Sequence, residues 1–315
     1  MSTTTPTPAA TDCTTRPPLW KVWLVAVRPF SFTTSTVPVI AASMLALYEG
    51  AVNVWALILM LIASISTHAG CNLANDYYDD ETGVDKKQVI GQAGVLQANW
   101  LTRREIGFGI IVAFAVALVA ALPIMIDIGR PIVILALLSA AAAYFYTGGP
   151  FPLAYWALGE VTVFLAMGVG MVVGTYYVHT GAVSTIAVLL SVAIGCVVTA
   201  ILHANNIRDR EVDRQHRKRT IANLLPRGFA NAEFQVLVLV PFALIAAMIV
   251  LDPGSWPIAV SALALPRALF LARTIADADT PRELNPYVRQ SAGLHMQFGL
   301  LITAGYIAAR LIEML

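Results

Sequence analysis

Charged residues are scarce in this chain. Asp, Glu, Lys and Arg make up only 12% of its 315 residues, whereas hydrophobic residues make up 58%. A soluble globular domain usually has about twice that charged share. The apolar residues lie in long runs without a polar face that could meet water, which excludes an amphipathic, water-soluble helical bundle. The composition therefore indicates an integral membrane protein.

Cysteine is also rare. Cys13, Cys71 and Cys196 are odd in number and widely separated. They form neither a disulfide framework nor the spacing of a metal site. We expect Cys71 and Cys196 to be small buried residues without redox chemistry.

The N-terminal segment lacks the apolar core and cleavage site of a signal peptide. Residues 1–19 are instead rich in Thr and Pro. Such a composition favours a disordered tail. We expect residues 20–315 to form one transmembrane domain.

Apolar runs that approach or exceed the length needed to cross a ~30 Å hydrocarbon core recur along the chain. They predict an all-α membrane protein, a bundle of about nine transmembrane helices. The expected spans are 26–48, 53–75, 104–126, 131–148, 155–178, 183–204, 233–251, 254–274 and 290–312.

Basic residues fall almost entirely in alternate connections. With the N-terminus in the cytoplasm, 18 of the 20 Lys and Arg residues lie on the cytoplasmic side, and Arg130 and Arg310 lie outside. This excess of positive charge is typical of cytoplasmic loops. The loops 76–103 and 205–231 are long and polar, so we expect the chemistry there.

Asparagine and acidic residues gather where the second span ends, in the segment NLANDYYDDETGVD (72–85). Asn72, Asp76 and Asp80 are spaced i, i+4, i+8, and Asp79 follows Asp76 by three residues. On a helix these side chains share one face. We call them the first stripe.

The sixth span ends in a similar way, in HANNIRDREVDRQHRKRT (203–220). Asp209 and Asp213 are four residues apart, so a helix would project both carboxylates from one face, with Asn205 and Asn206 one turn before Asp209. We call these four residues the second stripe. Either stripe taken alone is compatible with a solvated helix end.

If the two stripes face each other, several negative charges share a poorly hydrated space, which is unfavourable unless cations fill it. Mg²⁺ binds carboxylate and amide oxygens and often completes its shell with substrate phosphates. Basic residues lie within or after the two stripes and would suit a polyanion: Lys86, Lys87, Arg208, Arg217, Lys218 and Arg219. The sequence thus predicts a Mg²⁺–diphosphate site for a substrate whose remainder is apolar. As an alternative, the basic residues serve only to orient the chain in the membrane.

The two stripes resemble the paired aspartate-rich motifs of the UbiA superfamily of intramembrane prenyltransferases, and the likeness covers nearly all of the chain after the tail. RPFSFTTSTVPVIAAS (28–43) resembles the first helix of that superfamily. YFYTGGPFPLAYWALGE (144–160) resembles the segment joining its fourth and fifth helices. NNIRDREVDRQHRKRT (205–220) and LNPYVRQSAGLH (284–295) are similar to the menaquinone branch, the 1,4-dihydroxy-2-naphthoate polyprenyltransferases and their vertebrate relatives.

The resemblance implies roles for individual residues. The implied metal ligands are Asp76, Asp79, Asp80, Asp209 and Asp213, and the implied catalytic residues are Asp76, Asp80, Asp209 and Asp213. The implied substrate-binding residues are Arg28, Asn72, Asn75, Lys86, Tyr146, Asn205, Asn206, Arg217, Lys218 and Arg219. Members of the superfamily often carry a further Asp where this chain has Gly83, so which of Asp79, Asp80 and Asp85 binds metal is left open.

The roles of several other residues are left open. Tyr144, Tyr146 and Trp156 either line the isoprenoid pocket, where ring faces stabilise an allylic cation, or belong to the aromatic belt of the interface. Arg28 either orients a carboxylate of the acceptor or anchors the first span. His203 is a base, a partner of Asn206 or a packing residue. Glu160 is an acidic residue near a span and has no assigned role.

The resemblance also implies a reaction. A polyprenyl group would pass from polyprenyl diphosphate to 1,4-dihydroxy-2-naphthoate with loss of CO₂, giving demethylmenaquinone, and with Mg²⁺ as cofactor. Other acceptors of the superfamily are 4-hydroxybenzoate, homogentisate and a glyceryl phosphate lipid. The expected setting is the cytoplasmic membrane of a prokaryote, with the site on the cytoplasmic side and no nucleic acid as partner. Alternatives of another class are a membrane transporter and a scaffolding protein.

Overall fold

The structure is a computed structural model that describes residues 16–82, 94–148, 150, 152–216 and 218–315, with the backbone alone for residues 79–82 and 147. Within these ranges the chain consists of helices and their connections, with an isolated β-bridge between Trp156 and Arg219. Most of the expected tail, residues 1–15, lies outside the described part. The first helix, α1, spans Leu19–Val27.

Eight helices of the described part are long and apolar enough to cross a membrane. They are Pro29–Tyr48, Val54–Tyr78, Arg103–Ile128, Gly159–Thr180, Thr185–Arg208, Arg227–Leu251, Pro253–Asp277 and Pro281–Glu313. A ninth, α5 (Arg130–Thr147), is apolar but shorter. The predicted all-α membrane bundle of about nine helices is therefore confirmed.

Five of the eight spans are single helices over most of their length. They are α3 (Val54–Thr82), α4 (Arg103–Ile128), α8 (Thr185–Arg208), α11 (Arg227–Leu251) and α13 (Pro281–Glu313). The other three are composite. The first joins a 3₁₀ turn (Pro29–Phe32) to α2 (Thr33–Tyr48), the second joins α6 (Gly159–Val163), a π-helical segment (Phe164–Gly170) and α7 (Met171–Thr180), and the third joins 3₁₀ helix (Pro253–Ala264), α12 (Leu265–Thr274) and a 3₁₀ turn (Ile275–Asp277).

Local sequence fixes where several spans begin. Thr102 accepts a hydrogen bond from the backbone N–H of Glu105, whose carboxylate accepts from the backbone N–H of Thr102. Thr280 and Glu283 form the same reciprocal cap at the start of α13. These capping boxes satisfy backbone donors that a helix start leaves without partners.

The helices α3 and α8 carry the two stripes, and α8 is the more deeply buried. It packs against α11, α13 and the π-helical segment. The approach to that segment requires glycine, because a Cβ atom on Gly168 would lie 2.4 Å from the Cα atom of Gly195 on α8. This close contact fixes the position of Gly159–Thr180 beside α8.

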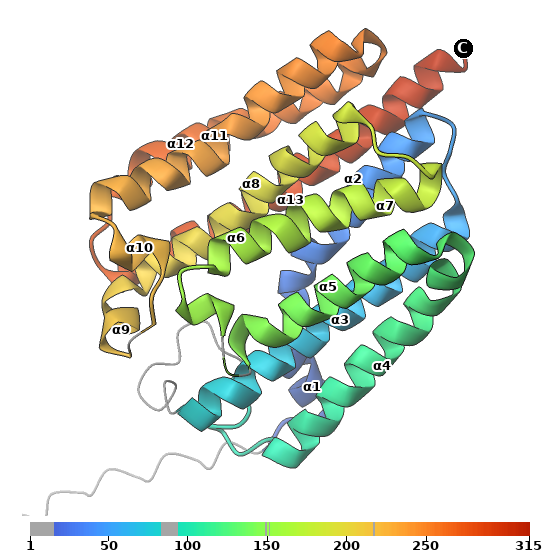
Figure 1. Cartoon of the computed structure of the whole chain (residues 1–315). Helices are drawn as coiled ribbons and strands as arrows, with labels where there is room; N and C mark the ends of the chain where they lie inside the picture. The colour runs from blue at the N-terminus through green and yellow to red at the C-terminus, as the bar shows by residue number, and fades with distance from the viewer. Residues whose placement is uncertain (1–15, 83–93, 149, 151, 217) are drawn as a thin grey trace, which may run out of the picture.

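Successive spans run in opposite directions, so every second connection lies at the same end of the bundle. Figure 1 shows the end of α3 and the short helices α9 (Arg210–Gln215) and α10 (Ile221–Leu224) at the same end, with the C-terminus at the opposite one. Arg130, at the start of α5, and Arg310, near the end of α13, belong to the opposite end. The helix order thus places the end of α3 and the segment that follows α8 at the same end of the bundle.

Candidate functional site

Two members of the first stripe, Asn72 and Asp76, have described side chains on α3. Asn72 and Asp76 are both buried, with exposed fractions of 7% and 5%. The amide nitrogen of Asn72 donates to the backbone oxygen of Val27 at 2.8 Å and to Oγ of Ser31 at 3.0 Å. Both amide hydrogens are therefore used by the junction between α1 and α2. The carbonyl oxygen of Asn72 therefore lies on the side of the amide away from this junction.

Arg28 stands at that junction and forms an ion pair with Asp76. Its backbone is left-handed, with φ of 54° and ψ of 64°, where it ends α1 immediately before Pro29. Such a conformation is uncommon for a residue other than glycine. The sequence suggested that Arg28 binds an acceptor carboxylate or anchors the first span. In this structure its partner is a carboxylate of the protein.

The second stripe spans a small break in the helix. α8 ends at Arg208 and α9 begins at Arg210, with Asp209 between them. The backbone N–H of Asp213 still donates to the backbone oxygen of Asp209 at 2.8 Å, so the i, i+4 relation expected from the sequence is retained. The structure therefore keeps both carboxylates about one turn apart. Asn205, by contrast, donates to the backbone oxygen of Ile201 within its own helix.

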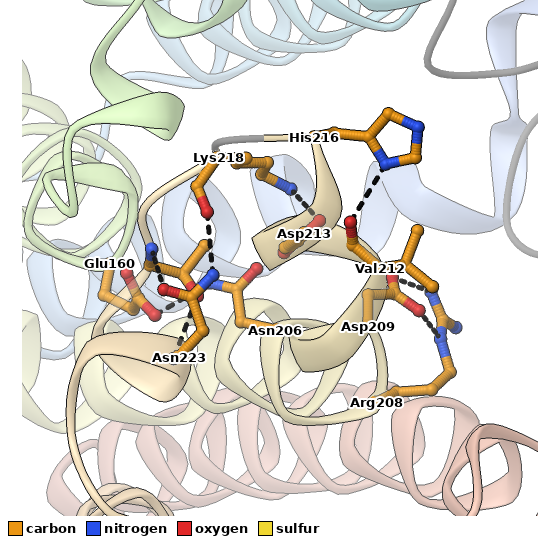
Figure 2. Close-up of polar contacts among 10 residues, drawn as sticks. Glu160, Asn206, Arg208, Asp209, Val212, Asp213, His216, Lys218 and Asn223 are labelled. Carbon is orange, nitrogen blue, oxygen red and sulfur yellow. Dashed lines mark hydrogen bonds and ion pairs between the residues drawn. The ribbon is translucent and has the colours of Figure 1, made fainter.

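Arg208 binds both oxygens of Asp209 (Figure 2). Its Nε lies 2.7 Å from Oδ1 and its Nη2 lies 2.6 Å from Oδ2. Its Nη1 donates to Oδ1 of Asn285 on α13 at 3.1 Å. Charge-assisted, bidentate pairs of this kind are strong and directional. Asn285 is a site neighbour that the sequence did not single out, although it lies in the LNPYVRQSAGLH segment.

Asp213 is buried and only partly satisfied. Nζ of Lys218 lies 3.3 Å from its Oδ1, while its Oδ2 is buried without a hydrogen-bond partner among the described residues. Burial raises the pKa of the Asp213 carboxyl, and the ammonium of Lys218 offsets part of that effect. A buried carboxylate oxygen without a donor is costly, and a cation is the natural partner for it.

The basic segment after α9 is fixed by the turn that leads into α10. Asn223 donates from its side chain to the backbone oxygen of Lys218 at 2.7 Å, and it forms a reciprocal cap with Thr220 (Figure 2). Asn223 was missed in the sequence, although the pattern Thr220-x-x-Asn223 is that of a helix start. Lys218 is therefore held beside Asp213.

Arg219 joins this segment to residues 153–158. Its backbone N–H donates to the oxygen of Tyr155 at 3.1 Å, and its oxygen accepts from Ala157 at 2.8 Å. Its guanidinium lies over the ring of Trp156, 5.8 Å from the centroid. Trp156 and Arg219, suggested separately by the sequence, thus form one contact.

Tyr146 is half-buried at the end of α5, on the same side of the bundle. A Cβ atom on Gly159 would lie 3.8 Å from its hydroxyl oxygen, so Tyr146 borders the start of α6. Tyr144 is exposed by 51% and packs edge-on against Phe145. Tyr146, rather than Tyr144, adjoins the buried part of the site.

Some predicted residues fall outside the described part of the chain. These are Asp85, Lys86, Lys87 and Arg217, together with the side chains of Asp79 and Asp80. Asn75 is described, on α3 and partly buried. Within the described residues, no three His, Cys, Asp or Glu side chains come together in a way that could hold one metal ion.

The donor set nevertheless fits a hard divalent cation. Asp76, Asp209 and Asp213 would supply carboxylate oxygens, and Asn72 and Asn206 would supply amide oxygens. Mg²⁺ prefers oxygens of these two kinds. The partnerless Oδ2 of Asp213 is the specific observation in favour of a cation there.

Fold and site together define a polytopic helical membrane protein with a polar site at one end of the bundle. Residues 35–294 match the model of the UbiA prenyltransferase family. The chain belongs to this family, and it is therefore a membrane prenyltransferase.

Curated relatives match over almost the whole chain. The chain is 25% identical over 289 residues to 1,4-dihydroxy-2-naphthoate octaprenyltransferase of Bacillus subtilis (strain 168), covering 92% of either chain. It is 30% identical over 291 residues to UbiA prenyltransferase domain-containing protein 1 of Danio rerio, covering 91% of this chain and 84% of the relative.

Solved structures show the same fold. An apo UbiA homolog from Aeropyrum pernix K1 matches with a TM-score of 0.66 and 20% identity, covering 91% of this chain and 99% of its own. A UbiA homolog from Archaeoglobus fulgidus, bound to GPP and Mg²⁺, matches with a TM-score of 0.63 and 15% identity, covering 90% and 99%.

Proposed function

We propose that this protein transfers a polyprenyl group from polyprenyl diphosphate to 1,4-dihydroxy-2-naphthoate. The allylic carbon–oxygen bond breaks and diphosphate leaves with the bonding electrons. The ring carbon that carries the carboxylate attacks the allylic carbon, and CO₂ departs, returning its electron pair to the ring. The direct product is the hydroquinone, which gives demethylmenaquinone on oxidation.

The observation that carries this proposal is the second stripe, where the carboxylates of Asp209 and Asp213 lie about one turn apart and the basic residues Lys218 and Arg219 follow in the same segment. Asp209 and Asp213 would hold Mg²⁺ together with Asp76 and with Asp79 or Asp80. Bound there, Mg²⁺ would supply positive charge to the departing diphosphate. The relatives named as octaprenyltransferases, and the Archaeoglobus homolog bound to GPP and Mg²⁺, support this assignment.

The chain's own cations would bind the remaining diphosphate oxygens. Lys218 and Arg219 follow the second stripe directly, and Lys86 and Arg217 are further candidates outside the described part. Arginine suits this role because its planar group binds two oxygens at once. Arg219 is already oriented by Trp156.

The allylic cation must be kept from water until the ring attacks it. The apolar spans exclude water from the inner part of the site, and ring faces stabilise a nearby cation. Tyr146 is our candidate for this contact because it is half-buried next to the start of α6. Trp156, exposed by 54%, serves chiefly to hold Arg219.

The acceptor is the finer part of the proposal. Arg28 is our candidate for its carboxylate, and this role requires the pair with Asp76 to open once the metal site is filled. An acceptor without a carboxylate on the attacked carbon would not need Arg28. A naphthoate labelled in its carboxyl group therefore reports on both the acceptor and the residue.

Purified protein in liposomes, given Mg²⁺ and radiolabelled polyprenyl diphosphate, tests the proposal. Each acceptor is offered in turn: the naphthoate, 4-hydroxybenzoate, homogentisate and a glyceryl phosphate lipid. We expect prenylated product and an equal amount of labelled CO₂ from the naphthoate alone. Product from another acceptor, but not from the naphthoate, would overturn the acceptor assignment, and solute flux without any product would favour a transporter.

We further propose that the N-terminus and the site lie on the cytoplasmic side of a prokaryotic membrane, with residues 20–315 acting as one domain. The support is the sorting of basic residues, which marks cytoplasmic loops. Under this proposal, polyprenyl diphosphate presents its charged end at the cytoplasmic interface. Its isoprenoid tail then stays among the spans.

A further inference from the structure

A buried polar cluster joins α6, α8 and α11 and includes Asn206 of the second stripe. Its members are Glu160 on α6, His203 and Asn206 on α8, and Glu233 on α11. The exposed fractions of Glu160, His203 and Asn206 are 3%, 0% and 4%. Burying an acid among apolar helices costs free energy unless hydrogen-bond partners offset it.

The hydrogen bonds of His203 determine how the cluster is held. Its Nε2 lies 2.8 Å from the backbone oxygen of Ala230, and because a carbonyl only accepts, Nε2 carries a proton. Its Nδ1 lies 3.3 Å from Oε1 of Glu160. A hydrogen bond between these two atoms needs a proton in addition to the one on Nε2, carried by either His203 or Glu160. His203 thus ties Glu160 to the backbone of α11.

Glu160 in turn determines which way the amide of Asn206 points. Nδ2 of Asn206 donates to Oε1 of Glu160 at 2.7 Å. If the amide were flipped, its oxygen would face the carboxylate oxygen without a proton between them. The carbonyl oxygen of Asn206 is therefore held on the side away from Glu160. In the view of Figure 2, Asn206 lies between Glu160 and the α9 segment that carries Asp213.

The helix register places Asn206 on the same side of the chain as the two carboxylates. Asn206 precedes Asp209 by three residues and Asp213 by seven, so the three share a face as the chain passes from α8 to α9. The first stripe shows the same arrangement, since both amide hydrogens of Asn72 are taken by Val27 and Ser31. In each stripe, hydrogen-bond acceptors of the protein bind the side-chain NH₂ group of an asparagine, so the carbonyl oxygen of that asparagine lies on the opposite side.

We propose that Glu160 is a positioning residue that orients the amide of Asn206, so that its carbonyl oxygen joins the divalent-metal ligands of the second stripe. This inference rests on the proposed function, because it takes the second stripe to bind the metal. Glu160 touches neither substrate nor metal under this proposal. It acts through Asn206 alone, and His203 keeps it in place.

Metal affinity provides a test that is independent of turnover. Mn²⁺ replaces Mg²⁺, and the EPR signal of free Mn²⁺ is followed in metal-depleted protein saturated with an unreactive prenyl thiolodiphosphate. Glu160→Met removes the acceptor and should weaken Mn²⁺ binding by about 10–100-fold, the range for partners that orient metal ligands. Glu160→Gln can still accept from Asn206 and should stay within about threefold of wild type. A Glu160→Met protein that loses only thermal stability, with unchanged Mn²⁺ affinity, would reduce Glu160 to a packing role.

A double-mutant cycle isolates the orienting effect. An aspartate at position 206 has an oxygen on both sides, so it needs no orientation. Glu160→Met should therefore weaken Mn²⁺ binding in the wild-type background but not in the Asn206→Asp background. Equal losses in both backgrounds would contradict the proposal.

Further variants keep the test decisive if Glu160→Met does not fold. Asn206→Ala removes the proposed ligand and should weaken Mn²⁺ binding as much; unchanged affinity would overturn the proposal by itself. Glu233→Gln is the matched control, because Glu233 lies 3.8 Å from His203 in the same cluster and has no part in the orientation of Asn206. It should bind Mn²⁺ like wild type.

Asp209→Asn separates this inference from the proposed function. If Asp209→Asn binds Mn²⁺ as wild type does, the second stripe is no metal site and the proposed function itself fails. If Asp209→Asn loses Mn²⁺ while Glu160→Met and Asn206→Ala do not, only the positioning role is wrong.

Discussion

The guanidinium of Arg208 binds both carboxylate oxygens of Asp209 and also reaches Asn285 on the last span. Arg208 is buried, whereas the Asp209 side chain is exposed by 33%. Asp209 therefore neutralises a buried cation, and under the proposed function it has a second task, because its remaining lone pairs would bind the metal. The two tasks can be separated by mutation.

Asp209→Asn should lower both activity and stability. Turnover is expected to fall by about 10²-fold or more, as when an electrostatic contact to developing charge is lost. Thermal unfolding in detergent should shift down by roughly 5 °C, because a buried arginine loses its counter-ion and solvent screening at Asp209 moderates the loss. Glu211→Gln, at an exposed residue of the same segment paired with Arg214, is the control and should change neither.

Adding Arg208→Gln to Asp209→Asn should restore the melting temperature but not turnover. The double variant contains no unpaired buried cation, so the structural loss is repaired. The carboxylate at the site remains absent. Recovery of turnover would show that Asp209 acts only through Arg208.

Asp213→Asn should raise the stability of metal-free protein, whereas Asp209→Asn should lower it. Burial raises the pKa of Asp213, so the folded protein binds this proton more tightly than the unfolded chain does. The stability that this proton contributes to the wild-type protein is fully present below the pKa of the unfolded chain. It is lost as pH rises through the raised pKa of the folded state. At pH 7 the variant should melt a few degrees higher than wild type, by roughly 1–3 °C, and the difference should shrink as pH is lowered.

Mg²⁺ should make the melting temperature of wild type higher than that of Asp213→Asn. With a prenyl thiolodiphosphate present, Mg²⁺ raises the melting temperature of wild type by mass action on the folded state. Asp213→Asn should show little of this gain. Melting curves at several pH values, with and without Mg²⁺, measure both effects, and an unchanged Mg²⁺ response would remove Asp213 from the metal site.

Gly168→Ala tests the packing that places the π-helical segment beside α8. A Cβ atom there would lie 2.4 Å from Cα of Gly195, which is backbone and cannot rotate away. Overpacking of this kind costs about 1–3 kcal/mol and should lower the melting temperature. Gly228→Ala is the matched control, since a Cβ atom on Gly228 meets nothing within 4 Å. Equal melting temperatures for the two variants would contradict the close approach.

Cysteine labelling tests the proposed orientation. Ala182 is exposed in the connection between α7 and α8, and Glu211 is exposed at the opposite end of the bundle. In a background without native cysteines, a membrane-impermeant maleimide added to intact cells should label Ala182→Cys. It should label Glu211→Cys only after the membrane is opened. The reverse pattern would invert the topology.

The architecture could be predicted from the sequence because length and hydropathy alone limit a membrane segment to a helix. The expected spans agree with the helices to within a few residues at most ends. The largest difference is at the last span, expected at 290–312 and found at Pro281–Glu313. Its polar first turns, including Arg282 and Glu283, concealed a helix start that the capping box of Thr280 marks.

The site was predictable only as far as helix periodicity reaches. The spacing of Asp209 and Asp213 gave their one-turn separation, which survives the break between α8 and α9. It could not reveal that Arg208 pairs with its own neighbour, or that Glu160 binds Asn206 across 46 positions of the chain. Such partners depend on how helices pack, and spacing within one helix carries no information about it.

The contact between Arg208 and Asn285 links the second stripe to a residue 77 positions further along the chain. Asn285 lies near the start of α13, which also packs against α2 and α8. During synthesis, the stripes of α3 and α8 enter the membrane well before α13 is made. The polar end of the bundle is therefore completed only when the final helix inserts, and a ribosome that stalls earlier leaves a chain with both acidic stripes but without this contact to Arg208.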